Sequence, residues 1–339
     1  MHKPDHIKPL IGITLGDPAG IGPEIVLKSW QHEEIHKMCR PLVFGGKIEL
    51  EQAQNMIMNP PEIRMINNVS DVQFEPEYLN YIDCGGVDHK IMLGEINGDC
   101  GKAAFNFIET AIDWCLQHKV TAMATAPINK ESLKAAQVPY LDHTEILARL
   151  THSDNPMTLF MVKNLRIFFY SRHISLKKVS EALEVDKLVE SLRCCNTALS
   201  QLGIKKPRIA IAALNPHGGE HGLFGTEETE ILEPAIASAC AFGLNVYGPI
   251  PADSVFNLCL EGHYDGVLSL YHDQGHIAAK TYDFHRTVSL TMGLPFLRTS
   301  VDHGTAFGIA GKGIANETGM IEAIKSAAQY GQQVRDWKN

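Results

Sequence analysis

The sequence has no surplus of basic residues. Its 30 Lys and Arg are outnumbered by 39 Asp and Glu, and the formal net charge is −9 at pH 7. A nucleic-acid-binding protein carries positive charge against the phosphate backbone, so this class of function is excluded, although a local basic pocket for one small anion is not. No apolar run is long enough to span a bilayer, and we expect no membrane partner.

The sequence also lacks a Cys-x-x-Cys pair among its eight cysteines. In a chain that begins Met-His-Lys-Pro without an apolar segment, such cysteines are typical of buried thiols in a cytoplasmic protein. Internal repeats, low-complexity tracts and a long linker are absent as well. The 339 residues, of which 45% are hydrophobic and 20% charged, predict an ordinary globular protein of about two domains.

Short apolar runs alternate with amphipathic helical stretches along the chain. The apolar runs predict strands at residues 9–15, 41–45, 120–125, 158–162, 167–170, 208–213, 244–247 and 266–270. The helical periodicity predicts helices at residues 22–38, 101–118, 176–202 and 226–242. This alternation predicts an α/β fold with a largely parallel sheet.

Because no linker divides the chain, we expect two domains formed by a chain that crosses over and returns. Residues 1–135 with 275–339 would form a cofactor-binding α/β domain, and residues 136–274 a second α/β domain. Loops at the carboxyl ends of the strands would line a cleft between the two domains.

A glycine-rich segment at residues 302–316 is the most informative part of the sequence. Its small residues let the backbone approach a ligand closely, and Asn316-Glu317 is expected to open a helix after it. Main-chain N–H groups there suit the phosphates or adenine of a nucleotide. The candidate cofactor-binding residues are His303, Gly304, Thr305, Ala306 and Gly311. The alternative is a glycine-rich turn that joins two helices.

A second glycine-rich turn, residues 16–22, directly follows the first strand. Gly16, Gly20 and Gly22 permit a tight turn, and Pro23-Glu24 suits a helix start. The spacing is not Gly-x-Gly-x-x-Gly, so the Rossmann fingerprint is excluded. Either a ligand loop contributing these three glycines or a purely structural turn fits the pattern.

Three histidines in separate loops are candidate metal ligands. His173, His217 and His272 each stand just past an apolar run, where parallel strands would aim their loops at one place. Three imidazoles with an open fourth position suit a divalent metal that polarises a hydroxyl or carbonyl oxygen. A single such histidine would be explained as a hydrogen-bonded loop residue.

Several cationic and polar residues suit an anionic substrate. Asp142 is expected to cap a helix, which places His143 and Thr144 at its positive end. Lys280 ends an apolar stretch, and Arg298 lies in a strand-like run where an unpaired charge is costly to bury. The alternative for either cation is a salt bridge at the surface.

Both glycine-rich segments resemble those of isopropylmalate and isocitrate dehydrogenases, in which the later segment holds the adenosine half of NAD. The whole set of motifs resembles the 4-hydroxythreonine-4-phosphate dehydrogenase family of pyridoxal phosphate biosynthesis. The matching stretches are residues 16–25, 126–130, 143–145, 172–173, 215–220, 248–256, 271–275 and 293–312.

The resemblance implies a fold of two α/β/α domains and a homodimer with a shared active site, the second domain carrying the dimer interface. It implies that His173, His217 and His272 bind a divalent metal, zinc first, or else cobalt, magnesium or manganese. The implied substrate-binding residues are His143, Thr144, Lys280, Ser289 and Arg298. The candidate catalytic residues are Lys280, His143 and Asp253, with Asp253 and Asp273 also candidates for the outer shell of the metal.

The reaction implied is oxidation of 4-hydroxythreonine 4-phosphate by NAD or NADP, followed by decarboxylation. Two positions depart from the family pattern. Ser289 stands where the family has Asn, so one substrate contact must change or pass through water. Gly308 stands where the related dehydrogenases have a carboxylate that repels a 2′-phosphate, which weakens any preference for NAD.

Three alternatives remain open. One is a dehydrogenase acting on D-threonate or D-erythronate 4-phosphate in sugar-acid catabolism. A second is a cis-dihydrodiol dehydrogenase, which needs no phosphate site. The third is a non-catalytic regulator that binds a metal or a nucleotide without turnover.

Overall fold

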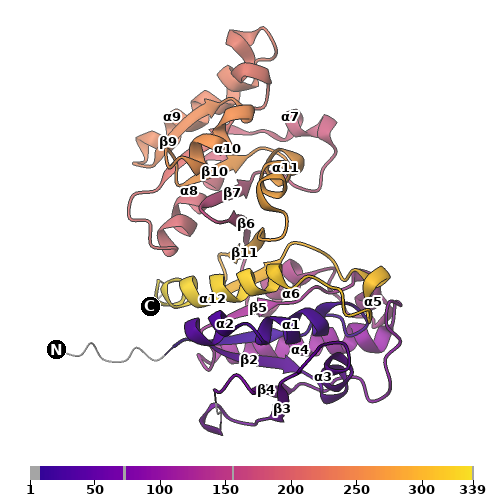
Figure 1. Ribbon diagram of the computed structural model, residues 1–339. Helices are drawn as coiled ribbons and strands as arrows, with labels where there is room; N and C mark the ends of the chain where they lie inside the picture. The colour runs from indigo at the N-terminus through magenta and orange to yellow at the C-terminus, as the bar shows by residue number, and fades with distance from the viewer. Residues whose placement is uncertain (1–7, 72–73, 155, 338–339) are drawn as a thin grey trace, which may run out of the picture. The chain divides into compact units, whose positions relative to one another are not determined.

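The computed structural model describes residues 8–71, 74–154 and 156–337 (Figure 1). The chain forms two compact units, unit 1 from residues 1–156 and 293–339 and unit 2 from residues 157–292. The units divide after residues 156 and 292, whereas boundaries were expected near 135 and 275. Those expected positions lie at the end of α5 (Lys130–Ala135) and inside α11 (His272–Asp283). The difference arises because β6 (Met157–Val162) and β11 (Val288–Met292) pair with each other and belong to unit 2.

Six parallel strands form the sheet of unit 1. Their order is β3 (Glu62–Met65), β4 (Tyr78–Asp83), β2 (Arg40–Gly45), β1 (Leu10–Thr14), β5 (Ala122–Thr125) and β12 (Leu297–Val301). The remaining elements of unit 1 are α1 (Gly22–Trp30), α2 (Glu33–Met38), α3 (Lys47–Gln54), η1 (Val69–Asp71), α4 (Gly98–Leu116), α5, α6 (His143–Leu150), η5 (Phe307–Ile309) and α12 (Thr318–Asp336).

Helices cover both faces of this sheet because neighbouring strand residues point to opposite sides. Met123 packs in one core cluster with apolar residues of α4, such as Phe105 and Ile108. Its neighbour Ala122 faces α12, where a Cβ on Gly331 would lie 2.6 Å from the Ala122 Cβ. The sheet is therefore the middle layer of an α/β/α arrangement.

Unit 2 repeats this layering around a mixed sheet. Its strand order is β11, β6, β7 (Leu165–Phe169), β10 (Gly266–Ser269), β8 (Arg208–Ala212) and β9 (Asn245–Ile250). β6 runs antiparallel to β7 and β11, and the other pairs are parallel. Ile167 and Phe169 pack in a core cluster with residues of α10 (Ala252–Leu260) and α11. Phe168 points to the opposite face, where α8 (Val185–Gln201) lies.

The α/β prediction is confirmed, but three predicted helices are interrupted. Residues 22–38 form α1 and α2, and residues 176–202 form η2 (Leu176–Lys178), α7 (Val179–Ala182) and α8. Residues 226–242 begin as the π-helical turn η4 (Glu228–Leu232) and continue as α9 (Glu233–Ala241). Pro234 explains that change, because proline has no N–H for the helical ladder. Among the helices of the described residues, none is both long and apolar enough to cross a membrane.

Candidate active site

The two glycine-rich segments of unit 1 pack against each other. A Cβ on Gly20 would lie 2.8 Å from the Thr305 Cβ, so only glycine permits this approach. The Ile21 N–H donates to the Thr305 carbonyl at 3.0 Å. Gly16 has a φ of +72°, and a side chain there would overlap the carbonyl of Pro127. The two segments predicted to bind the cofactor, although nearly 300 positions apart, thus contact each other at Gly20, Ile21 and Thr305.

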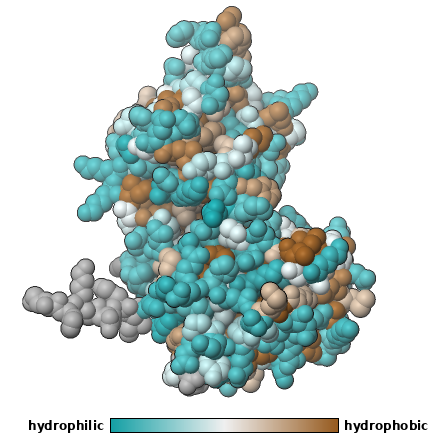
Figure 2. All heavy atoms as spheres, in the orientation of Figure 1, coloured by the Kyte–Doolittle hydropathy of each residue, from teal (hydrophilic) through white to brown (hydrophobic). Residues whose placement is uncertain are grey.

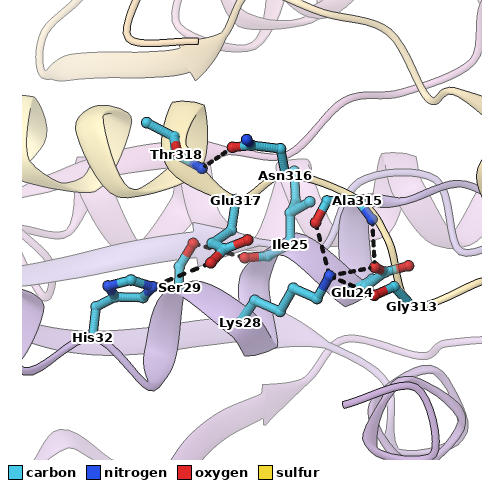
Figure 3. Close-up of polar contacts among 10 residues, drawn as sticks. All are labelled: Glu24, Ile25, Lys28, Ser29, His32, Gly313, Ala315, Asn316, Glu317 and Thr318. Carbon is cyan, nitrogen blue, oxygen red and sulfur yellow. Dashed lines mark hydrogen bonds and ion pairs between the residues drawn. The ribbon is translucent and has the colours of Figure 1, made fainter. Parts of the chain in front are cut away.

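Helix α1 fixes the far end of the later segment (Figure 3). The Lys28 ammonium donates to the carbonyls of Gly313 and Ala315 at 2.9 and 2.8 Å and to the Glu24 carboxylate at 2.8 Å. The buried Glu24 carboxylate also accepts from the Ala315 N–H at 2.8 Å. The ion pair of Glu24 and Lys28 thus fixes the end of the loop through backbone groups rather than side chains, and we call this pair the clamp. The start of α12 follows as expected, with the Thr318 N–H donating to the Asn316 side chain at 2.9 Å.

The middle of the segment has room beside its backbone. No atom lies within 4 Å of the position where a Cβ on Gly308 would stand. The Lys312 ammonium donates to the Gly308 carbonyl at 2.8 Å, and both residues are at the surface. His303 is half-buried, and its Nδ1–H donates to the Gly304 carbonyl at 3.0 Å.

Arg298 brings a buried positive charge to the same unit. The residue is 5% exposed, and its Nε and Nη2 atoms donate to the Thr125 hydroxyl at 3.0 and 2.7 Å. Burial lowers the pKa of Arg298 to about 9, against the opposing effect of Asp142. A buried guanidinium is a group that an anionic ligand can stabilise.

His143 lies close enough to Arg298 to feel its charge. Burial first, and the Arg298 charge second, hold the pKa of His143 well below its usual value, so the imidazole is neutral. Its Nε2 atom is buried and has no hydrogen-bond partner. An unsatisfied buried nitrogen beside a guanidinium is a costly arrangement that a bound phosphate or carboxylate would relieve.

The helix predicted at His143 is present as α6. The Asp142 carboxylate accepts from the Glu145 N–H at 3.1 Å, and the Glu145 carboxylate accepts in turn from the Leu141 N–H at 2.8 Å. These two bonds fix the first turn, with His143 and Thr144 at the positive helix end. The predicted cap is therefore confirmed.

The three candidate metal ligands follow three neighbouring parallel strands of unit 2. His173 follows β7, His272 follows β10 and His217 follows β8, and β10 pairs with both of the other strands. The buried side chain of Gln274 joins two of these strand ends: it donates to the Ala213 carbonyl at 2.8 Å and accepts from the Leu270 N–H at 2.7 Å.

The spacing of His173 and His272 is close to, but wider than, that of two ligands on one metal ion. The His272 Nδ1–H donates to the Asp273 carboxylate at 2.6 Å, which leaves the lone pair on Nε2. The two ring centroids are 6.2 Å apart. Two imidazoles on one zinc ion place their centres roughly 5–6 Å apart, given Zn–N bonds of about 2.0–2.1 Å. Within residues 8–71, 74–154 and 156–337, however, no three His, Cys, Asp or Glu side chains are grouped closely enough to hold an ion as they stand.

His217 lies on a left-handed turn, η3 (Pro216–Gly222). Residues 217–221 have φ between +41° and +78°, which non-glycine residues adopt at a cost. The buried Glu228 carboxylate holds the start of the turn, accepting from the N–H groups of Leu214 and Asn215 and from the Asn215 amide, each at 2.8 Å. No sequence signal other than the two consecutive glycines pointed to this conformation.

The remaining predicted residues also lie in unit 2. Lys280 is on α11, two turns after His272, and both line a surface pocket of about 460 Å³. Asp253 lies in the first turn of α10, and Ser289 lies on β11 opposite Phe160 of β6. The structure thus places the cofactor loops, His143, Thr144 and Arg298 in unit 1, and the three histidines, Lys280, Asp253 and Ser289 in unit 2.

Sequence reasoning missed several residues that shape these places. The pair Glu24 and Lys28 and the pair His272 and His276 both have the helical spacing of four residues, which was a usable signal. His276 is stacked on His272, and burial lowers its pKa to about 4. Thr125 and Gln274 gave no signal, because their roles depend on partners distant in sequence.

Comparison with known proteins gives a consistent result. The model of the family described as pyridoxal phosphate biosynthetic protein PdxA matches residues 37–327. A protein from Fusobacterium nucleatum subsp. nucleatum, named "Putative D-threonate 4-phosphate dehydrogenase", is 50% identical over 329 residues, covering 97% of this chain and 99% of its own.

Two solved structures have the same fold along nearly the whole chain. The 4-hydroxythreonine-4-phosphate dehydrogenase from Klebsiella pneumoniae is 39% identical with a TM-score of 0.90, covering 97% of this chain and 99% of its own. That from Burkholderia phymatum is also 39% identical with a TM-score of 0.85, covering 96% and 99%.

Proposed function

The chain belongs to the family of the pyridoxal phosphate biosynthetic protein PdxA, as its motifs predicted, and it is a dehydrogenase that acts on a CH–OH group. From this membership we propose that it oxidises and decarboxylates 4-hydroxythreonine 4-phosphate, using NAD or NADP and a divalent metal. The ketone formed lies β to the carboxylate, which is the position that favours loss of carbon dioxide.

The observation that carries this proposal is the buried Arg298 together with His143, whose buried Nε2 atom lies within reach of the Arg298 charge. A substrate with a phosphate and a carboxylate needs fixed cationic groups, and a guanidinium donates to either group through two parallel bonds. His143 is neutral, so its buried Nε2 can form a hydrogen bond with substrate without repelling Arg298. Thr144, in the first turn of α6, adds a hydroxyl to these substrate-binding groups, and the N-terminus of the helix adds backbone N–H groups.

His173, His217 and His272 would hold the metal, zinc first, with cobalt, manganese and magnesium as the other candidates. A bound divalent ion would lower the pKa of the substrate hydroxyl, and the nicotinamide would accept the hydride. Asp273 keeps His272 in the tautomer that has its lone pair on Nε2. Lys280 lines the same pocket as His272 and is the candidate for the group that takes or returns a proton, with Asp253 as a further candidate.

The cofactor would lie against the joined glycine-rich segments of unit 1. Gly16, Gly20, Gly22, His303, Gly304, Thr305, Ala306 and Gly311 would contact it. Their backbone N–H groups and the absence of large side chains suit close approach by the adenosine and its phosphates. The clamp from Lys28 and Glu24 keeps this backbone in place before the cofactor arrives.

A second candidate substrate is D-threonate or D-erythronate 4-phosphate. The 50% identity with the Fusobacterium protein favours it, since that protein carries the threonate 4-phosphate name. Ser289, in place of the family Asn, fits either substrate. The two candidates share the phosphate, the carboxylate and the oxidised hydroxyl, so both use the same Arg298 and histidine residues.

The test is a turnover assay of the purified protein with NAD and with NADP. The substrates are 4-hydroxythreonine 4-phosphate, D-threonate 4-phosphate and D-erythronate 4-phosphate, each beside its unphosphorylated form, and a cis-dihydrodiol. Zinc, cobalt, manganese and magnesium are added in turn after chelator treatment. We expect turnover of the phosphorylated acids alone. Turnover of the cis-dihydrodiol alone, or tight NAD binding without any turnover, would overturn the proposal.

A further inference from the structure

His276 lies one helical turn after His272 and stacks on it. The two ring centroids are 3.6 Å apart and the ring planes differ by 10°. On its other sides His276 contacts Phe160 and Phe169, with ring centroids 4.3 and 4.6 Å away. The imidazole of His272 therefore rests on a ring that is itself held by the core of unit 2.

A hydrogen bond fixes the orientation of His276 as well. Its Nδ1 atom is 2.8 Å from the His272 carbonyl oxygen, and because a carbonyl only accepts, Nδ1 carries the proton. The ring of His276 is thus fixed by one hydrogen bond and two aromatic contacts. Parallel rings at this separation cannot both direct a nitrogen lone pair at the same ion, so His276 is not a fourth ligand.

The role left for His276 is to restrict the motion of its neighbour. The side chain of His272 is 41% exposed at the first position of α11, and its hydrogen bond to Asp273 fixes one edge of the ring but not its face. An exposed imidazole loses rotational freedom when it binds a metal. A ring already stacked in one orientation has lost that freedom beforehand, and the centroid of the His272 ring lies 6.2 Å from that of His173.

We propose that His276 is a positioning residue that preorganises His272 for metal binding through ring stacking. The proposal deepens the function proposed above and rests on the assignment of His272 as a metal ligand. It assigns His276 no contact with substrate or metal.

The experiment measures cobalt and zinc affinity by competition with a chromophoric chelator, together with the visible absorption spectrum of the cobalt form. The full chain is compared with His276→Ala, His276→Leu and His276→Phe. The matched control is His285→Ala, an exposed histidine just beyond the same helix. We expect about tenfold weaker metal binding for His276→Ala, in the range of residues that support a ligand. His276→Phe keeps a flat ring and should recover most of the affinity, whereas His276→Leu fills the space without one.

Each outcome decides one claim. Equal affinities of the wild type and His276→Ala would overturn the role of His276 alone. If His276→Ala does not fold, the metal affinities of His276→Phe and His276→Leu can still be compared, because both side chains fill the space beside Phe160 and Phe169. Equal affinities of those two variants would also overturn the role of stacking. A wild-type protein that binds neither cobalt nor zinc would instead remove the metal site, and the proposed function with it.

Discussion

At the scale of single residues, Arg298 is the side chain whose removal should be most visible in the kinetics. Arg298→Ala should raise the KM for the phosphorylated substrate tenfold or more, because a charged hydrogen bond is worth about 1.5–3 kcal/mol. Arg298→Lys should recover part of the loss, since it restores the charge without the planar fork. The control is Arg335→Ala on α12, where the arginine pairs with a neighbouring aspartate. Unaltered kinetics of Arg298→Ala would remove the residue from the site.

Gly308 should control the choice between NAD and NADP. Gly308→Asp introduces a carboxylate where nothing lies within 4 Å of the new Cβ, so the fold should tolerate it. A carboxylate near the adenosine ribose repels a 2′-phosphate, and the NAD/NADP ratio of kcat/KM should rise roughly ten- to a hundredfold. Gly308→Ala is the uncharged control and should leave the ratio unchanged. The same ratio in all three proteins would mean that the ribose lies elsewhere.

The neutral state of His143 should appear in the pH dependence of stability. Burial and the Arg298 charge lower its pKa in the folded protein, so below pH 6.5 the unfolded chain takes up a proton that the folded protein does not. The free energy of unfolding should therefore fall as the pH falls through that range, by up to about 1.4 kcal/mol per pH unit. His143→Gln should flatten the fall in Tm between pH 7 and 5. The exposed His118→Gln should leave the Tm profile as in the wild type.

At the scale of elements, helix α1 and the glycine-rich loop should behave as one structure. Lys28→Met removes three hydrogen bonds and leaves the buried Glu24 carboxylate without its cation. The expected loss is about 2–4 kcal/mol of unfolding free energy, together with a higher KM for the nicotinamide. Adding Glu24→Gln should recover part of the stability, because the amide oxygen still accepts from Ala315.

The control for this pair is Lys37→Met on α2, where an exposed ion pair with Glu33 is worth little. Chemical denaturation and the KM for NAD and NADP are measured for all four proteins. A Lys28→Met protein with wild-type stability and cofactor affinity would show that the loop holds its shape without the clamp.

Helices and strands were predictable where the sequence pattern that indicates them lies within one continuous segment. The buried strands β1, β5, β8 and β10 and the start of α6 follow directly from apolar runs and from the Asp142 cap. The short edge strand β3 was not predictable, since none of its four residues is buried: the first and last are exposed and the middle two half-buried. The left-handed turn at His217 was not predictable either, because Glu228, eleven residues later, stabilises it.

At the scale of the whole molecule, topology explains why the placement of the three histidines at neighbouring strand ends could be predicted. The prediction that three histidines after three apolar runs lie at one edge of the sheet required only that the three strands be parallel neighbours. The parallel pairing of β10 with β7 and β8 meets this requirement. The boundaries of the units could not be placed in the same way. They depend on β6 and β11, which lie about 130 residues apart and pair antiparallel, with β6 also antiparallel to β7.

Exposed apolar residues support the predicted homodimer. Figure 2 shows such residues on the surface of both units. In unit 2 the segment after each of the three histidines exposes such residues, among them Ile174, Leu223 and Ile277, which are 41%, 70% and 63% exposed. Apolar groups in such positions are typical of surfaces that a partner covers. We therefore expect a dimer in analytical ultracentrifugation.

A shared active site makes a sharper prediction for mixed dimers. Arg298→Ala changes unit 1 and His272→Ala changes unit 2, and each variant alone should be nearly inactive at a substrate concentration well below KM. If a site combines unit 1 of one subunit with unit 2 of its partner, every mixed dimer has one doubly altered site and one intact site. Random mixing of equal amounts should then restore about a quarter of the wild-type activity, because half of the dimers are mixed. Sites built within one chain would instead leave every site with one substitution, and mixing by co-refolding would restore nothing.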